Sequence, residues 1–353
     1  MNNRQDKPLR PATRRRSWQR VAGISAMLAG AGLLAGAAVV TWQTFNPDPL
    51  YRYELQELAD AQDADGDADS DAPVLRKGSL VEMDSDRELA TFEVANSDSG
   101  PVLMKWHPSI DAPFLTLVPE YDEVAALGEV LDRHVPEGRP VLAWWDTSRQ
   151  LQQFAAIDPV FNQYVGQPLF IPSPWKSQAD LVRSTEQAFW QEGQDTADTA
   201  EQERFQAFAD ALLMDEQQGM KKLQELAGHE EAVLVLHIRD AIMLGQMDAS
   251  RMGVAFRQFA ESGDLHTTVG GVRDWLSRND YAAYSLMQGS ASKVRAVALV
   301  DEDSASTLAA RLLPFIGNDQ EDVDGAKLVY RTGEFIVYEI ASDSEDAMEE
   351  KHS

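Results

Sequence analysis

The sequence predicts an α/β protein in which a single N-terminal transmembrane helix precedes a mixed, mostly parallel sheet covered by helices, with a C-terminal β-hairpin. Three observations predict this fold class. Residues 21–42 carry no charge, apolar runs alternate with segments of helical spacing along the rest of the chain, and Arg331-Thr332-Gly333 is a hairpin signal between two strand patterns.

The N-terminal segment has the pattern of a signal anchor. Residues 1–20 form a basic tail that contains seven Lys and Arg residues against Asp6. As a helix, residues 21–42 would extend about 33 Å, which is enough to cross a hydrocarbon core of roughly 30 Å. Because the basic residues precede the span, the N-terminus is expected in the cytoplasm. We therefore expect a single-pass protein of the bacterial inner membrane whose C-terminal domain lies in the periplasm.

A cleaved signal peptide is the alternative interpretation of this segment. Ala35-Gly36-Ala37 has the small-residue pattern of a processing site. The apolar run, however, exceeds the usual h-region of roughly 7–15 residues, which favours a retained anchor. The sequence alone leaves open whether the segment is cleaved.

The composition excludes several classes of protein. The chain has no cysteine, so it cannot be a disulfide scaffold, ligate an iron–sulfur cluster through thiolates or attach haem through Cys-x-x-Cys-His. Its net charge of −27 argues against a nucleic-acid partner, because phosphate binding needs clustered Lys and Arg. No spacing of histidines or carboxylates predicts a metal, and we expect no cofactor.

Two acidic segments flank the expected domain. Residues 43–73 are a predicted linker, because residues 60–71 alternate Asp with Ala, Gly and Ser and are too polar to bury a core. Residues 74–341 are expected to form one periplasmic α/β domain with a small β-rich part at its start. Residues 342–353 are expected to be an acidic disordered tail.

The first half of the expected domain begins with strand patterns. Residues 102–106 and 114–118 look like short strands separated by proline-containing turns, and residues 121–133 have the apolar spacing of a helix. Residues 141–145 form a continuous apolar run, which is typical of a strand buried on both faces. Residues 147–156 then suit a helix.

The second half repeats the alternation. Residues 168–171 suit a short strand, and residues 178–226 are largely helical with an interruption near 193–199. Two further buried strands are expected at residues 232–238 and 294–300, with helical segments between them.

The C-terminal end of the domain completes the pattern. A helix is expected at residues 304–313, and residues 327–330 and 334–340 form the two strands of the hairpin. Helices that alternate with buried strands indicate a sheet covered on both faces.

The strongest candidate site follows the predicted strand at residues 141–145. Trp144 and Trp145 end this strand, and Asp146, Arg149 and Gln150 come directly after them. Ligands of α/β sheets gather beyond the carboxyl ends of strands, where Arg149 could pair with Asp146 or with an anionic ligand. The alternative is structural: Asp146 caps the following helix and the two tryptophans belong to the core.

Two further candidates follow other predicted strands. Alternation along the strand would put His237 and Arg239 on one face, with Asp240 capping the next helix, although a structural histidine is the more frequent case. Trp175 could rim the same cleft as a stacking surface, or it could belong to a packed turn.

No phosphate-binding loop, Gly-x-Ser-x-Gly elbow or His-Glu-x-x-His pair occurs, so a non-catalytic protein is favoured over an enzyme.

The N-terminal anchor, the string Trp144-Trp145-Asp146-Thr147-Ser148-Arg149-Gln150, the string His237-Ile238-Arg239-Asp240 and the overall length resemble the hydroxylamine oxidation protein HaoB family. The resemblance covers most of the chain. It implies an accessory protein of nitrification, encoded beside a periplasmic multihaem hydroxylamine oxidoreductase that it would anchor, mature or couple. It assigns no catalytic residue.

A second resemblance leads to a different class of function. The motif Trp144-Trp145-Asp146 is similar to the motif in the soluble domain of oligosaccharyltransferase-type glycosyltransferases, although Thr147-Ser148 replaces the Tyr-Gly that follows there. This resemblance implies a glycan- or peptide-binding module whose surface includes Trp144, Trp145, Asp146 and Trp175. A third hypothesis, an enzyme, requires Asp146 and His237 to converge within hydrogen-bond reach.

Overall fold

The computed structural model describes residues 49–56, 74–110, 115, 117–166, 171, 173–191, 199–260, 265–288, 293–317 and 322–342. The predicted anchor at residues 21–42, most of the predicted linker and all but the first residue of the predicted tail lie outside these residues. No helix within the described ranges is long and apolar enough to cross a membrane. The described elements belong to one compact unit that begins at Leu50.

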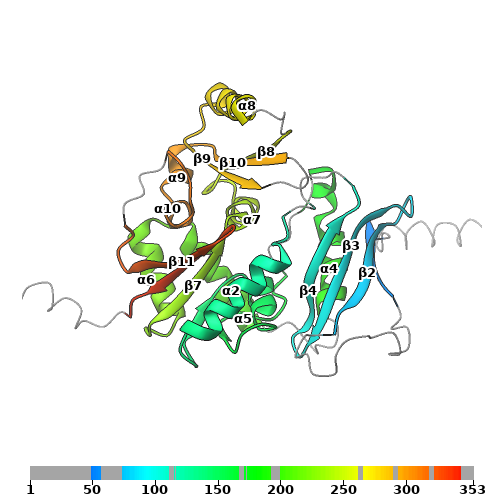
Figure 1. Ribbon diagram of the computed structural model, residues 1–353, viewed down its shortest axis with the longest axis horizontal. Coiled ribbons are helices and arrows are strands. Elements are labelled where there is room, and N and C mark those ends of the chain that lie inside the picture. Colours follow the sequence, from blue (N-terminus) through cyan, green and yellow to red (C-terminus); the bar gives the residue numbers. More distant parts are fainter. Residues whose placement is uncertain are drawn as a thin grey trace, which may run out of the picture. The chain divides into compact units, whose positions relative to one another are not determined.

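The first sheet is an antiparallel meander of four strands in sequence order (Figure 1). Its strands are β1 (Tyr51–Leu55), β2 (Arg76–Glu82), β3 (Glu88–Ser97) and β4 (Gly100–Pro108). The predicted strand at residues 102–106 is part of β4. Strand β1, by contrast, lies inside the segment predicted as a linker, so the folded domain begins earlier than residue 74.

The central sheet contains five strands in the order β11-β12-β7-β5-β6. Strand β5 pairs in parallel with β6 and with β7, whereas β12 pairs antiparallel with β7 and with β11. The bounds of these strands are β5 (Pro140–Leu142), β6 (Asp158–Pro159), β7 (Ala232–His237), β11 (Ala326–Thr332) and β12 (Phe335–Ile340). The predicted C-terminal hairpin is thereby confirmed as β11 and β12.

Helices cover both faces of the central sheet, as predicted. Helix α2 (Tyr121–His134) packs on one face, where Leu127 and Leu131 meet Val233 and Val235 of β7. The other face packs against α5 (Thr199–Leu212), α6 (Glu216–Leu226) and α10 (Leu308–Leu312). Every residue of β7 is buried, which explains its uninterrupted apolar sequence.

The third sheet has three antiparallel strands in the order β8-β10-β9, and α8 (Leu265–Asn279) packs on one of its faces (Figure 1). Its strands are β8 (Val254–Ala260), β9 (Ala283–Gln288) and β10 (Lys293–Leu299). Residues 294–300, predicted as a strand of the main sheet, therefore lie in a separate sheet.

The prediction of a mostly parallel sheet is wrong. Among the described strands only the pairings of β5 with β6 and with β7 are parallel. Strands joined by short turns pair antiparallel, as β2 with β3, β3 with β4, and β11 with β12 do here.

Several predicted boundaries also change. The predicted strand at residues 114–118 is not formed at Leu115, Leu117 or Val118, and Ile171 is not in a strand. The helical stretch at residues 178–226 is divided into α4 (Ala179–Trp190), α5 and α6, and Asp215 caps α6 by accepting a hydrogen bond from the Gln218 N–H.

Other helices begin or end earlier than predicted. The predicted helix at residues 304–313 is split into α9 (Glu302–Ala305) and α10, because Thr307 caps α10. The helix predicted from residue 147 is α3 (Trp145–Leu151), so Trp145 belongs to this helix and not to the preceding strand.

Candidate functional site

The site lies beyond the carboxyl ends of two neighbouring parallel strands. Strands β5 and β7 pair with Val141 beside Val233 and Leu142 beside Leu234. Helix α3 begins three residues after β5, and α7 (Arg239–Met247) begins two residues after β7. The first turns of both helices therefore meet at one edge of the sheet, where α/β folds bind ligands.

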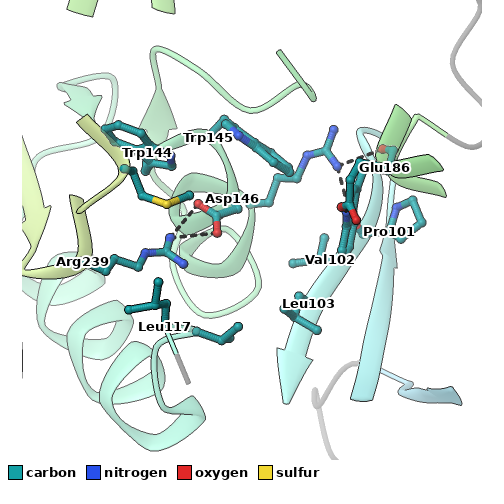
Figure 2. Close-up of a pocket in the computed structure, with 13 residues that line it drawn as sticks. Pro101, Val102, Leu103, Leu117, Trp144, Trp145, Asp146, Glu186 and Arg239 are labelled. Carbon is teal, nitrogen blue, oxygen red and sulfur yellow. Dashed lines mark hydrogen bonds and ion pairs between the residues drawn. The ribbon is translucent and has the colours of Figure 1, made fainter. Parts of the chain in front are cut away.

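An ion pair joins these two helices (Figure 2). Nη2 of Arg239 lies 2.7 Å from Oδ1 and 2.8 Å from Oδ2 of Asp146, and it also donates to the Thr147 hydroxyl at 3.1 Å. The Asp146 side chain is 27% exposed and that of Arg239 is 5% exposed. Asp146 is therefore the accessible member of a largely buried pair.

Asp146 is not the helix cap that the structural alternative predicted. Trp144 occupies the N-cap position of α3, and Oδ1 of Asp146 accepts a hydrogen bond from the adjacent Thr147 N–H at 2.8 Å. No hydrogen bond or ion pair within the described part of the chain joins Asp146 to Arg149. The predicted partner of Asp146 is thus wrong, and Arg239 takes that place.

Arg149 instead binds three backbone carbonyls. Its Nε donates to Asn162 O at 2.5 Å, and its Nη1 donates to Pro101 O at 3.2 Å and to Trp190 O at 3.1 Å. Pro101 lies in the edge strand β4, and Trp190 is the last residue of α4, whose final carbonyls lack partners within the helix. Arg149 therefore connects three separate segments of the chain.

The environment of Arg149 keeps it cationic at neutral pH. Burial lowers the pKa of its guanidinium to about 10, and the charges of Asp146 and Glu201 oppose this shift. Its Cζ lies 5.0 Å from the ring centroid of Trp145, in the position of a cation–π contact. The neighbouring Gln150 donates from Nε2 to Leu103 O of β4 at 2.7 Å. Arg149 and Gln150 thus attach the edge of the first sheet to α3.

His237 and Asp240 form a buried turn between β7 and α7. The His237 N–H donates to Oδ2 of Asp240 at 2.8 Å, and Nδ1 of His237 accepts from the Arg239 N–H at 3.1 Å. The expected placement of His237 and Arg239 on one strand face is wrong, because β7 ends at His237. Asp240 lies in the first turn of α7 and not at its N-cap, which is Ile238.

Burial shifts the pKa values of both groups. It lowers the pKa of His237 well below its usual value, and the positive charge of Arg239 acts in the same direction. It raises the pKa of Asp240 to about 7, although Arg239 and the His237 N–H oppose this change. Nε2 of His237 is 3.6 Å from Oε2 of Glu334. His237 does not line the cavity that opens beside the Asp146–Arg239 ion pair.

A cavity of about 140 Å³ opens beside the ion pair (Figure 2). It lies between β4, α3, α4, α7 and the segment that contains Leu117. Its wall is mostly apolar, and its lining residues are Pro101, Val102, Leu103, Leu117, Val118, Trp144, Trp145, Asp146, Arg149, Glu186, Trp190, Arg239 and Met243. Five of the nine predicted site residues therefore lie in one cavity wall.

Glu186 is a cavity residue that the sequence-based prediction missed. Both tyrosine hydroxyls of β1 donate to its Oε1, that of Tyr53 at 2.8 Å, and Trp190 Nε1 donates to its Oε2 at 2.5 Å. Burial raises the pKa of Glu186, and these hydrogen bonds oppose the increase. A signal was available, because Glu186 lies between Val182 and Trp190 at i and i+4 spacing on the buried face of α4.

The three tryptophans do not form one surface. Trp144 is buried against Phe205 and Phe208, and Trp145 is buried against Tyr164. Trp175 lies in the short helix η2 (Ser173–Gln178) and stacks on Tyr51 at a ring distance of 5.2 Å. The predicted aromatic rim is therefore wrong, and Trp175 belongs to a packed turn.

The described residues contain no group of three or more His, Cys, Asp or Glu side chains that could hold a metal ion. The enzyme hypothesis required Asp146 and His237 within hydrogen-bond reach, and no such hydrogen bond joins them in the described structure. The arrangement supplies a small cavity with buried donors and one accessible carboxylate.

The family comparison covers the whole described fold. The family model for the HaoA-associated protein HaoB matches residues 18–340, from before the predicted span to the end of β12. No curated protein matches the chain. The match includes the Trp-Trp-Asp segment and the β7–α7 junction, on which the resemblance depended. The chain therefore belongs to the family of HaoA-associated proteins HaoB.

Proposed function

We propose that this chain is a membrane-anchored accessory protein that binds the hydroxylamine oxidoreductase HaoA and holds it at the periplasmic face of the inner membrane. The observation that carries the proposal is the family match, because the family is described by its association with HaoA. Hydroxylamine oxidation is then the process that the chain serves, and the oxidative chemistry belongs to its partner.

The N-terminal segment supports the anchoring part of the proposal. The family match begins at residue 18, so the uncharged residues 21–42 belong to the matched region. A span of this length preceded by arginines is typical of a single-pass anchor with its N-terminus in the cytoplasm. The α/β domain would then reach the compartment in which a periplasmic partner is found.

We expect the full-length protein to remain in the membrane pellet after alkaline carbonate extraction. External protease added to spheroplasts should degrade the α/β domain, because this domain would face the periplasm. A variant that lacks residues 21–42, exported by a cleavable signal peptide, is the matched control and should appear in the soluble periplasm. Release of the full-length chain by carbonate would contradict the anchor.

The same control variant tests the proposed role toward HaoA. With the full-length chain, HaoA should sediment with membranes, and with the exported variant it should become soluble at unchanged haem content. Loss of haem from HaoA in the deletion strain would indicate maturation as the role instead. An unchanged distribution of HaoA in both strains would contradict anchoring.

A further inference from the structure

The cavity beside the ion pair has a mainly apolar wall. Val102 of β4, Leu117 and Val118 of the segment before α2, and Met243 of α7 all line it, together with three tryptophans. A molecule inside would therefore place most of its surface against hydrocarbon and aromatic groups. Such a lining, with a few polar groups that fix the orientation, is typical of small-molecule sites.

Three of the four charged side chains in the wall are largely closed to a ligand. Arg149, Arg239 and Glu186 are 1%, 4% and 6% exposed. The guanidinium of Arg149 is held by three backbone carbonyls, and its remaining atom Nη2 is buried. Both carboxylate oxygens of Glu186 already accept hydrogen bonds from side chains of β1 and α4.

Asp146 is the charged side chain of the wall that a ligand can reach, because it is 27% exposed. An ionised carboxylate offers about four acceptor positions. Nη2 of Arg239 donates to both oxygens, and the Thr147 N–H donates to Oδ1. One acceptor position on Oδ2 is therefore left for a hydrogen-bond donor of the ligand.

The charges of the wall favour an uncharged ligand. Two acidic and two basic side chains line the cavity, and its accessible charge, that of Asp146, is already paired with Arg239 at 2.7 Å. A charged ligand would lose its hydration without gaining an unpaired counter-charge, and burial of an unpaired charge is costly. A neutral molecule pays no such penalty.

The volume of the cavity limits the size of the ligand. It is about 140 Å³, which is close to that of a protein cavity of roughly 150 Å³ known to hold benzene. A ligand of about six non-hydrogen atoms would therefore fill it. Water fits less well, because an ordered water needs about two to four polar partners and the wall is mainly apolar.

We propose that the cavity binds a small uncharged molecule of the class of a five-carbon alcohol, whose hydroxyl donates a hydrogen bond to Asp146 and whose hydrocarbon body packs against Val118 and Met243. The proposal goes beyond the association with HaoA and does not depend on it. The ligand would lie where β4 and α4 meet α3 and α7.

The test measures binding of four probes to the purified full-length chain in detergent by tryptophan fluorescence, since three tryptophans line the cavity. Each probe has six non-hydrogen atoms. 1-Pentanol represents the proposed class, butyl methyl ether lacks the donor, butyrate is an anion and pentylammonium is a cation. 1-Pentanol should bind saturably, about tenfold more tightly than the ether and at least tenfold more tightly than either ion.

Two substitutions of Val118 locate the site. Val118→Phe should fill the cavity and abolish binding of 1-pentanol. Val118→Ala removes two methyl groups, so the enlarged cavity should also bind 1-heptanol, which is two carbons longer and which the wild type should exclude. Val269→Phe, at an exposed position of α8 outside the cavity, is the matched control and should bind as the wild type does. A constant detergent concentration makes uptake of the probes by micelles the same for all variants.

Three results would overturn the proposal. Equal binding of 1-pentanol by the wild type and by folded Val118→Phe would show that the probe does not enter the cavity. Equal affinities for 1-pentanol and the ether would exclude the hydrogen bond to Asp146, and tighter binding of either ion would exclude an uncharged ligand. New binding of 1-heptanol by Val118→Ala supports the proposal even where Val118→Phe does not fold. Retention of HaoA at the membrane is measured separately, so failure of either proposal leaves the other result intact.

Discussion

Replacement of Arg149 by leucine should lower the free energy of unfolding by about 3–5 kcal/mol, because three buried backbone carbonyls lose their hydrogen-bond donor. The substitution leaves the carbonyls of Pro101, Asn162 and Trp190 without their donor. Each unsatisfied buried carbonyl costs about 1–3 kcal/mol, and the recovered desolvation of the guanidinium offsets part of the sum. Urea unfolding of the wild-type and variant domains measures the difference.

The matched control for this prediction is Arg183→Leu in α4. Arg183 forms an exposed ion pair with Asp180, and exposed pairs contribute little to stability. Arg149→Lys should recover part of the loss, because one ammonium group cannot reach all three carbonyls. Equal unfolding midpoints for Arg149→Leu and Arg183→Leu would show that Arg149 does not connect β4 to α4.

Asp240→Asn should change how stability depends on pH. The pKa of Asp240 rises from 3.8 to about 7 in the folded protein, so the native state holds this proton more tightly than the unfolded chain. Its stabilising contribution is complete below pH 3.8 and is lost as the pH rises to 7, by about 4 kcal/mol in total. The asparagine side chain can still accept the His237 N–H, so the variant should lack only this pH-dependent loss.

His237→Asn should change the pH dependence of the free energy of unfolding in the opposite direction. The pKa of His237 is lowered in the folded protein, so its contribution is complete above pH 6.5 and is lost as the pH falls. The measurement is the free energy of unfolding of wild type and both variants from pH 4 to pH 8. Parallel curves for wild type and Asp240→Asn would contradict the raised pKa of the carboxyl group.

Local sequence patterns were sufficient to predict strands that are buried on both faces and helices that are regularly amphipathic. Strand β7 and helix α2 were predicted nearly to their ends, and so was the C-terminal hairpin. Strand β1 was missed although Tyr51-Arg52-Tyr53-Glu54-Leu55 alternates apolar and polar residues, because the acidic segment after it dominated the interpretation.

Sheet membership was not accessible in the same way. The second half of β10, residues 296–299, is an apolar run like that of a central strand, yet β10 lies between β8 and β9 in a separate sheet. Helix α8 covers one face of β10 and the main core covers the other. Both faces of β10 are therefore buried although it is not part of the central sheet. Strand pairing depends on contacts between segments that are distant in the sequence. The hydrophobic periodicity of a single strand does not show these contacts.

The candidate site, too, was predictable only in part from local sequence patterns. Its position at the ends of β5 and β7 was predictable, because polar residues follow both buried strands. The partner of Asp146 was not, since Arg239 is 93 positions away in the sequence and Arg149 is only three. The hydrogen-bond partners of Arg149, three backbone carbonyls, leave no mark on the sequence, so its role in connecting three segments was not predictable.

The central claim is association with HaoA, and affinity capture of the full-length chain from mildly solubilised native membranes tests it most directly. A tagged full-length chain should retain HaoA, identified by its haem absorbance and by mass spectrometry, at a fixed ratio over repeated washes. Recovery of the intact, folded tagged chain without HaoA under conditions that preserve HaoA activity would contradict the claim.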